Sequence, residues 1–173
     1  MQMKLNIHKM TSLALLSTIA LTIFVLESAI PTPVPVPGIK LGLANIVTLF
    51  VIKRMGTKEA ALVLFVRIVL STVIAGQAVS FLYSICGGGL CLIVMGLVNL
   101  FLQGHGIFIT SIFGAIAHNI GQILAAFLVL RMTGILAYVP FLLISGIITG
   151  LFTGVAAYFA DRYIPKQFAS ETR

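Results

Sequence analysis

Charged side chains are scarce in this sequence. Only 9% of the residues are Asp, Glu, Lys or Arg, whereas 60% are hydrophobic, and the mean hydropathy is +1.15. A soluble domain carries about 25% charged residues, so this chain lacks the polar side chains needed to cover a water-exposed surface. The scarcity of charge excludes an ordinary soluble protein and predicts one integral membrane domain over residues 1–173.

Acidic residues are the scarcest charged type. The chain has one aspartate, Asp161, and three scattered glutamates, Glu27, Glu59 and Glu171. A Mg²⁺-dependent diphosphate site needs several carboxylate oxygens close together, and no two acids here have such a spacing. The sequence also lacks a P-loop, so we expect no ATP hydrolysis by this chain. We predict no catalytic residues, no metal site and no cofactor, and therefore no enzyme.

Cysteine is nearly absent as well. Cys86 and Cys91 lie five residues apart inside an apolar run. This spacing suits neither a disulfide framework nor a metal or haem site. We interpret both residues as small buried hydrophobic side chains.

Long apolar runs, in contrast, are abundant. A helix that crosses a bilayer needs about 20 apolar residues. We predict an all-α, polytopic membrane protein that forms a six-helix bundle. The expected spans are approximately residues 10–30, 40–54, 59–74, 80–102, 107–130 and 136–160, of which the fourth is interrupted or bent at Gly87–Gly89.

Between the first two spans, proline alternates with other residues over positions 31–38. This pattern predicts a stiff, non-helical loop. Positive charge gathers on the opposite side of a six-span protein, which fits the positive-inside rule. We therefore predict a plasma-membrane protein with both termini cytoplasmic and an extracellular 31–38 loop. The net charge of +7 reflects this topology and an attraction to anionic lipid, and we expect no nucleic-acid partner. The Lys and Arg residues on the predicted cytoplasmic side are Lys4, Lys9, Lys53, Arg54, Lys58, Arg162, Lys166 and Arg173.

Several polar residues fall where burial in a bilayer is unfavourable. Such residues usually face a cavity or one another. Most of them lie in the predicted outer half of the membrane, which indicates a pocket open to the outside rather than a pore. We expect Arg67, His118, Asn119 and Gln122 to form its floor, with Lys40 and Asn45 at its rim and Glu27 nearby. Positive residues outnumber Glu27 there, so an anionic ligand is favoured.

Each of these residues also has a structural interpretation. Arg67 would pair with Glu27 or with helix carbonyls, and Glu27 would pair with Lys40. The cluster of His118, Asn119 and Gln122 would tie helices together by hydrogen bonds.

Small residues recur at a spacing of four in two spans. Ala14, Thr18 and Thr22 follow this spacing in the first span, and Gly146, Gly150 and Gly154 follow it in the last. Small residues at this spacing let helices approach closely. They indicate packing within the fold or a docking face for a partner membrane protein.

The segment from Glu27 to Asn45 is the most distinctive motif, with the sequence ESAIPTPVPVPGIKLGLAN. Together with Arg67, the Ser80–Ser84 segment, the glycines of the fourth span and the HNIGQ motif at 118–122, it resembles the Gx transporter family, also labelled heptaprenyl diphosphate synthase component I. The resemblance covers nearly the whole chain. The overall pattern is also similar to the substrate-binding S components of energy-coupling factor (ECF) vitamin transporters.

The resemblance implies a membrane component that binds a small molecule and works with a separate ATPase-driven coupling module. In S components an Ala-xxx-Ala signature in the first helix docks on that module, and here only Ala14-xxx-Thr18 matches it. Family members accompany flavin- or quinone-linked redox proteins, which implies a flavin, a quinone precursor or a prenyl phosphate as cargo. The alternative is a non-catalytic membrane subunit that supports isoprenoid-quinone synthesis or an extracellular electron-transfer complex with redox membrane proteins.

Overall fold

The computed structural model describes residues 7–30, 39–76 and 78–165, and within these ranges the chain contains helices and no strand. The prediction of an all-α bundle of six helices is confirmed. The proline-rich segment 31–38, predicted to be an outer loop, lies outside the described residues. The elements are α1 (Ile7–Ser28), α2 (Asn45–Arg54), α3 (Thr57–Ala75), α4 (Ala78–Phe101), α5 (Ile107–Leu130), the 3-10 helix η1 (Thr133–Tyr138) and α6 (Val139–Tyr163).

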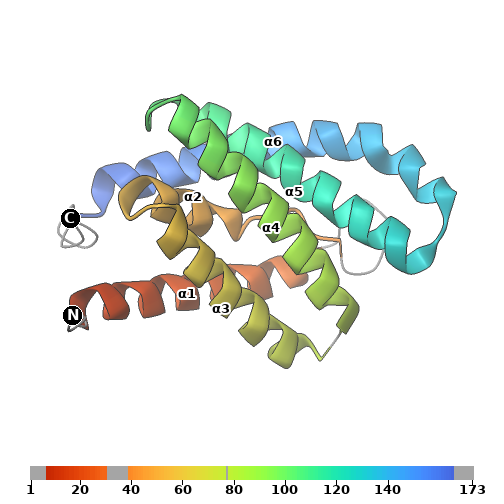
Figure 1. Ribbon diagram of the computed structural model, residues 1–173, viewed down its shortest axis with the longest axis horizontal. Helices are drawn as coiled ribbons and strands as arrows, with labels where there is room; N and C mark the ends of the chain where they lie inside the picture. Colours follow the sequence, from red (N-terminus) through yellow and green to blue (C-terminus); the bar gives the residue numbers. More distant parts are fainter. Residues whose placement is uncertain (1–6, 31–38, 77, 166–173) are drawn as a thin grey trace, which may run out of the picture.

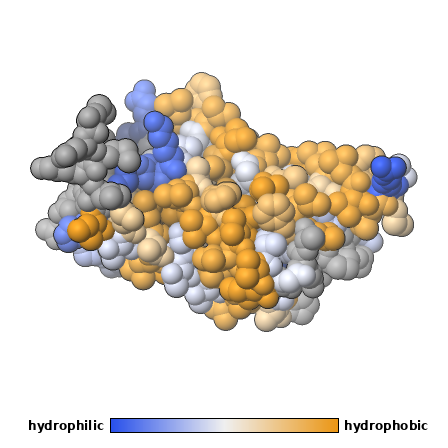
Figure 2. Space-filling view, turned by 60° about the horizontal axis from the view of Figure 1, so that its bottom comes forward, coloured by the Kyte–Doolittle hydropathy of each residue, from blue (hydrophilic) through white to orange (hydrophobic). Residues whose placement is uncertain are grey.

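The helices run back and forth between two ends of the molecule. The start of α1, the turn from α2 to α3 and the end of α6 lie together at one end, at the left in Figure 1. Helix α5 lies between α4 and α6 and makes its most extensive contacts with these two helices. On the face shown in Figure 2, hydrophobic residues cover the middle and hydrophilic residues gather at the two ends. This distribution matches a protein whose middle lies in a bilayer.

Within the described residues, four stretches are long and apolar enough to cross a membrane, namely α1, α4, α5 and η1 together with α6. The chain is thus a multi-pass membrane protein. Helix α3 has 19 residues and is about 28 Å long, close to the thickness of a hydrocarbon core. Helix α2 has 10 residues and reaches only about 15 Å, half of that thickness. The predicted second span is therefore a half-length helix.

The second helix also begins later than predicted. The sequence suggested a start at Lys40, but α2 begins at Asn45. Gly42 has a φ of +85°, a left-handed conformation that an α-helix cannot contain. The carboxylate of Glu27 accepts hydrogen bonds from the backbone N–H groups of Gly42 at 2.5 Å and Leu43 at 3.1 Å. Irregular backbone inside a membrane protein requires such partners, and Glu27 supplies them.

The predicted interruption of the fourth span at Gly87–Gly89 is wrong. Helix α4 is continuous through these glycines. A β-carbon at Gly121 of α5 would lie 2.4 Å from the carbonyl oxygen of Cys86 and 2.8 Å from the α-carbon of Gly87. Gly87 and Gly121 therefore allow the backbones of α4 and α5 to approach closely, and α4 is not broken there.

The two small-residue stripes have different surroundings. The glycines of α6 pack on α5, since a β-carbon at Gly150 would lie 2.6 Å from the α-carbon of Ile112. This stripe therefore serves packing within the fold. On α1, Ala14 and Thr18 are exposed. The Thr18 hydroxyl donates to the Ala14 carbonyl at 3.0 Å, so the exposed stripe has its hydroxyl satisfied within α1.

Ion pairs join the helices at the end where α1 begins. Lys9 contacts Glu59 at 2.6 Å, which links the start of α1 to the start of α3. Asp161 of α6 pairs with Lys53 at 3.0 Å and also with Arg54, both in the last turn of α2. These contacts fix the basic end of the molecule, which the sequence predicts to be cytoplasmic.

Candidate functional site

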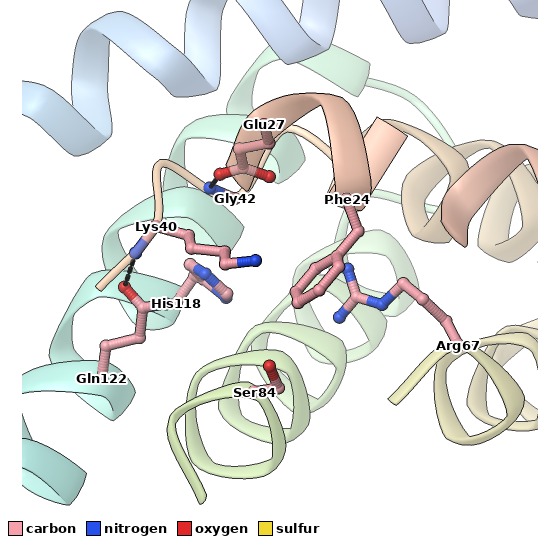
Figure 3. A pocket seen from close by; sticks show the side chains of 8 residues that line it. All are labelled: Phe24, Glu27, Lys40, Gly42, Arg67, Ser84, His118 and Gln122. Carbon is pink, nitrogen blue, oxygen red and sulfur yellow. Dashed lines mark hydrogen bonds between the residues drawn. The ribbon is translucent and has the colours of Figure 1, made fainter. Parts of the chain in front are cut away.

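A small polar cavity lies inside the bundle, where α1, the irregular segment 39–44, α3, α4 and α5 meet. Figure 3 shows its lining side chains converging from these elements. The cavity includes several of the residues that the sequence predicted for a pocket. Its lining consists of Phe24, Glu27, Lys40, Gly42, Arg67, Ser84, His118 and Gln122.

His118 of α5 occupies a slot between two glycines. A β-carbon at Gly42 would lie 2.8 Å from the imidazole Cδ2, and one at Gly87 would lie 3.1 Å from Nδ1 and Cε1. Any side chain at either position would displace the ring. Both ring nitrogens are buried and lack a hydrogen-bond partner among the described residues. The fold thus holds His118 in a tight slot beside the backbone of Gly87.

Arg67 projects from the middle of α3 towards the same cavity (Figure 3). The residue is 3% exposed, and its Nε lacks a hydrogen-bond partner in the described part of the chain. The ion pairs found among the described residues do not include Arg67. Glu27 lines the same cavity but lies beyond salt-bridge distance of Arg67. A buried charge without a direct ion pair is unfavourable, so this guanidinium is suited to bind an anion.

Among the described residues, Glu27 is the one carboxylate that lines the cavity, together with the cations Lys40 and Arg67. Its two oxygens already accept the backbone N–H groups of Gly42 and Leu43. Glu27 therefore stabilises the turn before α2. The sequence did not predict this role. With two cations and one engaged carboxylate, the cavity lining carries a net positive charge.

Lys40 and Phe24 close one side of the cavity. The Lys40 Nζ lies 3.2 Å from the centre of the Phe24 ring and also donates to the hydroxyl of Ser28. The Lys40 backbone N–H donates to the Gln122 Oε1 at 3.2 Å. Gln122 thereby ties the irregular segment to α5, next to His118.

The cavity is nearly filled by its own lining. The space open to the centre of a water molecule is about 10 Å³, roughly the room for a single water. Arg67 and His118 therefore line a space that one water fills. An organic ligand requires the walls to move apart.

The structure separates two of the predicted pocket residues from the others. Asn45 is buried next to the cavity, since a β-carbon at Gly42 would lie 2.8 Å from its Nδ2, but it does not line the cavity. Asn119 points to the other side of α5, where its Nδ2 donates to the Leu142 carbonyl of α6 at 2.7 Å. Asn119 is therefore not part of the floor beneath Arg67. Ala14 and Thr18 lie on the exposed surface of α1.

Three cavity residues were not among the predicted site residues. Phe24 is apolar, and an apolar run gives no signal that one of its members lines a polar cavity. Ser84 belonged to the quoted Ser80–Ser84 segment but carried no individual role. Gly42 was readable only as a glycine close to a predicted helix start, and its contact with His118 depends on the tertiary fold.

Among the described residues, no group of three or more His, Cys, Asp or Glu side chains could hold a metal ion. The fold and the cavity define an all-helical, multi-pass membrane protein with a cationic interior site. The chain belongs to the heptaprenyl diphosphate synthase component I family, whose model matches residues 16–160. The family resemblance in the sequence is thus confirmed. No curated protein and no solved structure matches the chain, so the likeness to S components stays a prediction.

Proposed function

We propose that this protein is the substrate-binding component of a small-molecule transporter in the plasma membrane, and that its interior cavity binds an anionic ligand. The observation that carries the proposal is the buried Arg67 guanidinium, which lacks a carboxylate partner within salt-bridge distance among the described residues. Lys40 and the unpartnered His118 nitrogens add a second cation and hydrogen-bonding groups on the same cavity. The role is binding rather than catalysis.

The cargo classes that suit this site are anions with an apolar body. A guanidinium beside an ammonium group suits a phosphate or a carboxylate, because both accept charge-assisted hydrogen bonds. The apolar helices around the cavity suit the rest of such a molecule. The family name supports a prenyl diphosphate, and a flavin phosphate or an aromatic carboxylate of the quinone-precursor type has the same chemistry.

Uptake of such a ligand requires opening of the cavity, which holds about one water when closed. Outside the contacting group α4, α5 and α6, the wall consists of the end of α1 with Phe24 and Glu27, the segment 39–44, and Arg67 of α3. We propose that the end of α1 and the segment 39–44 move outwards on the extracellular side. The energy for release comes from a separate ATPase-driven module in the membrane.

A binding panel tests this proposal. Purified protein is heated with flavin mononucleotide, an aromatic quinone-precursor carboxylate or a prenyl diphosphate, and the shift in melting temperature is measured. One of these probes should stabilise the wild type by several degrees, while Arg67→Ala and His118→Ala lose the shift. Arg131→Ala removes an exposed cation outside the cavity and should keep it. Equal shifts in all variants would exclude the cavity as the site.

The exposed stripe of Ala14 and Thr18 on α1 favours a second candidate function. A satisfied small-residue face lets another membrane helix pack closely. In this case the protein is a non-catalytic subunit that supports isoprenoid-quinone synthesis or an extracellular electron-transfer complex. Tight co-purification of a membrane enzyme, lost in Ala14→Leu, together with no response to the probes, would favour this alternative.

A further inference from the structure

The charge of the polar cavity limits how much negative charge a ligand can carry. Glu27, Lys40 and Arg67 approach the cavity from α1, from the segment 39–44 and from α3 (Figure 3). Two positive groups and one negative group leave the lining with one net positive charge. Charges in the interior of a membrane protein are unfavourable unless other charges balance them. A ligand with one negative charge therefore makes the occupied site neutral.

The other charged residues in the described part of the chain do not line this cavity. The ion pairs found among the described residues all lie at the basic end of the molecule. Arg131 is exposed at the end of α5. The segment 31–38, which follows α1 in the sequence, contains no charged residue. The charge balance of the cavity thus rests on Glu27, Lys40 and Arg67.

Three titratable groups of the lining enter this count besides Arg67. Burial lowers the pKa of Lys40 to about 8, so its ammonium form predominates at pH 7. The Lys40 Nζ lies 3.2 Å from the centre of the Phe24 ring, a cation–π contact that requires the charged form. Glu27 accepts two backbone N–H groups with its two oxygens, as an ionised carboxylate does. His118 is 3% exposed and lines the same cavity as Arg67, so a proton on its ring would add a second unbalanced charge, and we count it as neutral.

We propose that the polar cavity selects ligands with a single negative charge, and that its cargo is a monoanionic organic acid such as an aromatic carboxylate. This inference rests on the proposed function and narrows it. A flavin phosphate or a prenyl diphosphate carries more than one negative charge, and the excess would stay unbalanced inside the bilayer. Among the described residues, no group of three or more His, Cys, Asp or Glu side chains could bring in a metal cation to balance it. Opening of the cavity changes the distances between its groups but not their charges.

Two probes with the same body separate charge from shape. The esters 2-naphthyl sulfate and 2-naphthyl phosphate share the ring and a tetrahedral head. At pH 7 the sulfate carries one negative charge and the phosphate carries close to two. Equilibrium binding of each probe to the purified full-length protein gives a ratio of dissociation constants. The wild type should bind the sulfate at least about tenfold tighter than the phosphate.

Two glutamate variants test whether charge balance sets this preference. Glu27→Gln gives the lining two net positive charges and keeps one acceptor oxygen for the backbone N–H groups. It should shift the ratio at least about tenfold towards the phosphate. Glu59→Gln removes a carboxylate that pairs with Lys9 outside the cavity, and it should keep the wild-type ratio.

Equal or tighter binding of the phosphate by the wild type would overturn the inference without any variant. If Arg67→Met abolishes that phosphate binding, the proposed function stands and only the selection for one charge is wrong. An unchanged ratio in a folded Glu27→Gln would also overturn the inference, because charge balance would then not set the preference. Binding of neither probe would overturn it too, and the panel of anionic probes described above would decide the proposed function separately.

Discussion

The ammonium nitrogen of Lys40 lies 3.2 Å from the centre of the Phe24 ring, inside the lining of the polar cavity. The Cζ of Arg67 lies 5.8 Å from the centre of the same ring. Figure 3 shows the ring between the two cationic side chains. In this closed state the aromatic ring occupies the place between the two groups that we propose bind one anion.

Removing the Phe24 ring should therefore strengthen anion binding. Phe24→Ala removes two cation–π contacts of about 0.5–1 kcal/mol each, which an anion must otherwise displace, so anion affinity should rise about tenfold. The free variant should be less stable by roughly 3 kcal/mol, because a buried phenylalanine is lost. Titration calorimetry and thermal melting measure the two effects. Phe65→Ala, at a 62% exposed position, is the control. Weaker binding by a folded Phe24→Ala would mean that the ring supports the ligand.

Two glycines of α4 provide a matched pair of variants. A β-carbon at Gly87 would lie 2.8 Å from the Gln122 Cγ and 3.1 Å from His118, whereas one at Gly89 meets nothing within 4 Å. Gly87→Ala should displace both side chains and lower anion affinity at least tenfold, about 1.4 kcal/mol. Gly89→Ala should bind as the wild type does. The same titration applied to both variants decides whether the His118 slot matters for binding.

The close approach of α4 and α5 sets a stability prediction. In Gly121→Ala the new β-carbon would lie 2.4 Å from the Cys86 carbonyl oxygen, and backbone on both sides leaves little room to relax. Such overpacking should destabilise the protein by about 1–3 kcal/mol. Gly134→Ala, where a β-carbon meets nothing within 4 Å, should melt at the wild-type temperature. Equal melting temperatures for the two variants would argue against this helix contact.

The direction of insertion can be tested with single cysteines. In a background with Cys86→Ala and Cys91→Ala, Gly134→Cys lies between α5 and α6, and His105→Cys lies between α4 and α5. Both positions are exposed. The predicted topology requires a membrane-impermeant maleimide to label Gly134→Cys on intact cells, and His105→Cys only after the membrane is opened. The reverse labelling pattern would show that the protein has the opposite orientation, with the predicted outer side facing the cytoplasm.

Helix positions could be read from the sequence because apolar runs of this length have few alternatives in a bilayer. The 107–130 prediction coincides with α5. Arg67, His118 and Gln122, which the sequence singled out because their burial is unfavourable, line the polar cavity. The faces of α5 were harder to predict. His118 and Asn119 are adjacent in sequence and lie about 100° apart around a helix, so only the position of α6 reveals that the Asn119 amide bonds the Leu142 carbonyl and does not line the polar cavity.

The start of α2 could not be predicted for a related reason. It depends on Glu27, fifteen residues away from Gly42, whose carboxylate binds the Gly42 and Leu43 amides. The triple glycine of α4 was misread because glycine marks both helix breaks and close helix contacts. Only the presence of Gly121 on the neighbouring helix identifies the second case here.

The most direct test of the central claim compares equilibrium binding of the three anionic probes to the wild type, Arg67→Met and Arg131→Gln. Methionine preserves much of the length and apolar volume of the arginine stem but carries no charge. We predict that one probe binds the wild type and Arg131→Gln with equal affinity, and that Arg67→Met loses this binding at least a hundredfold, about 2.7 kcal/mol. Unchanged affinity in Arg67→Met, or no binding of any probe to the wild type, would contradict the account.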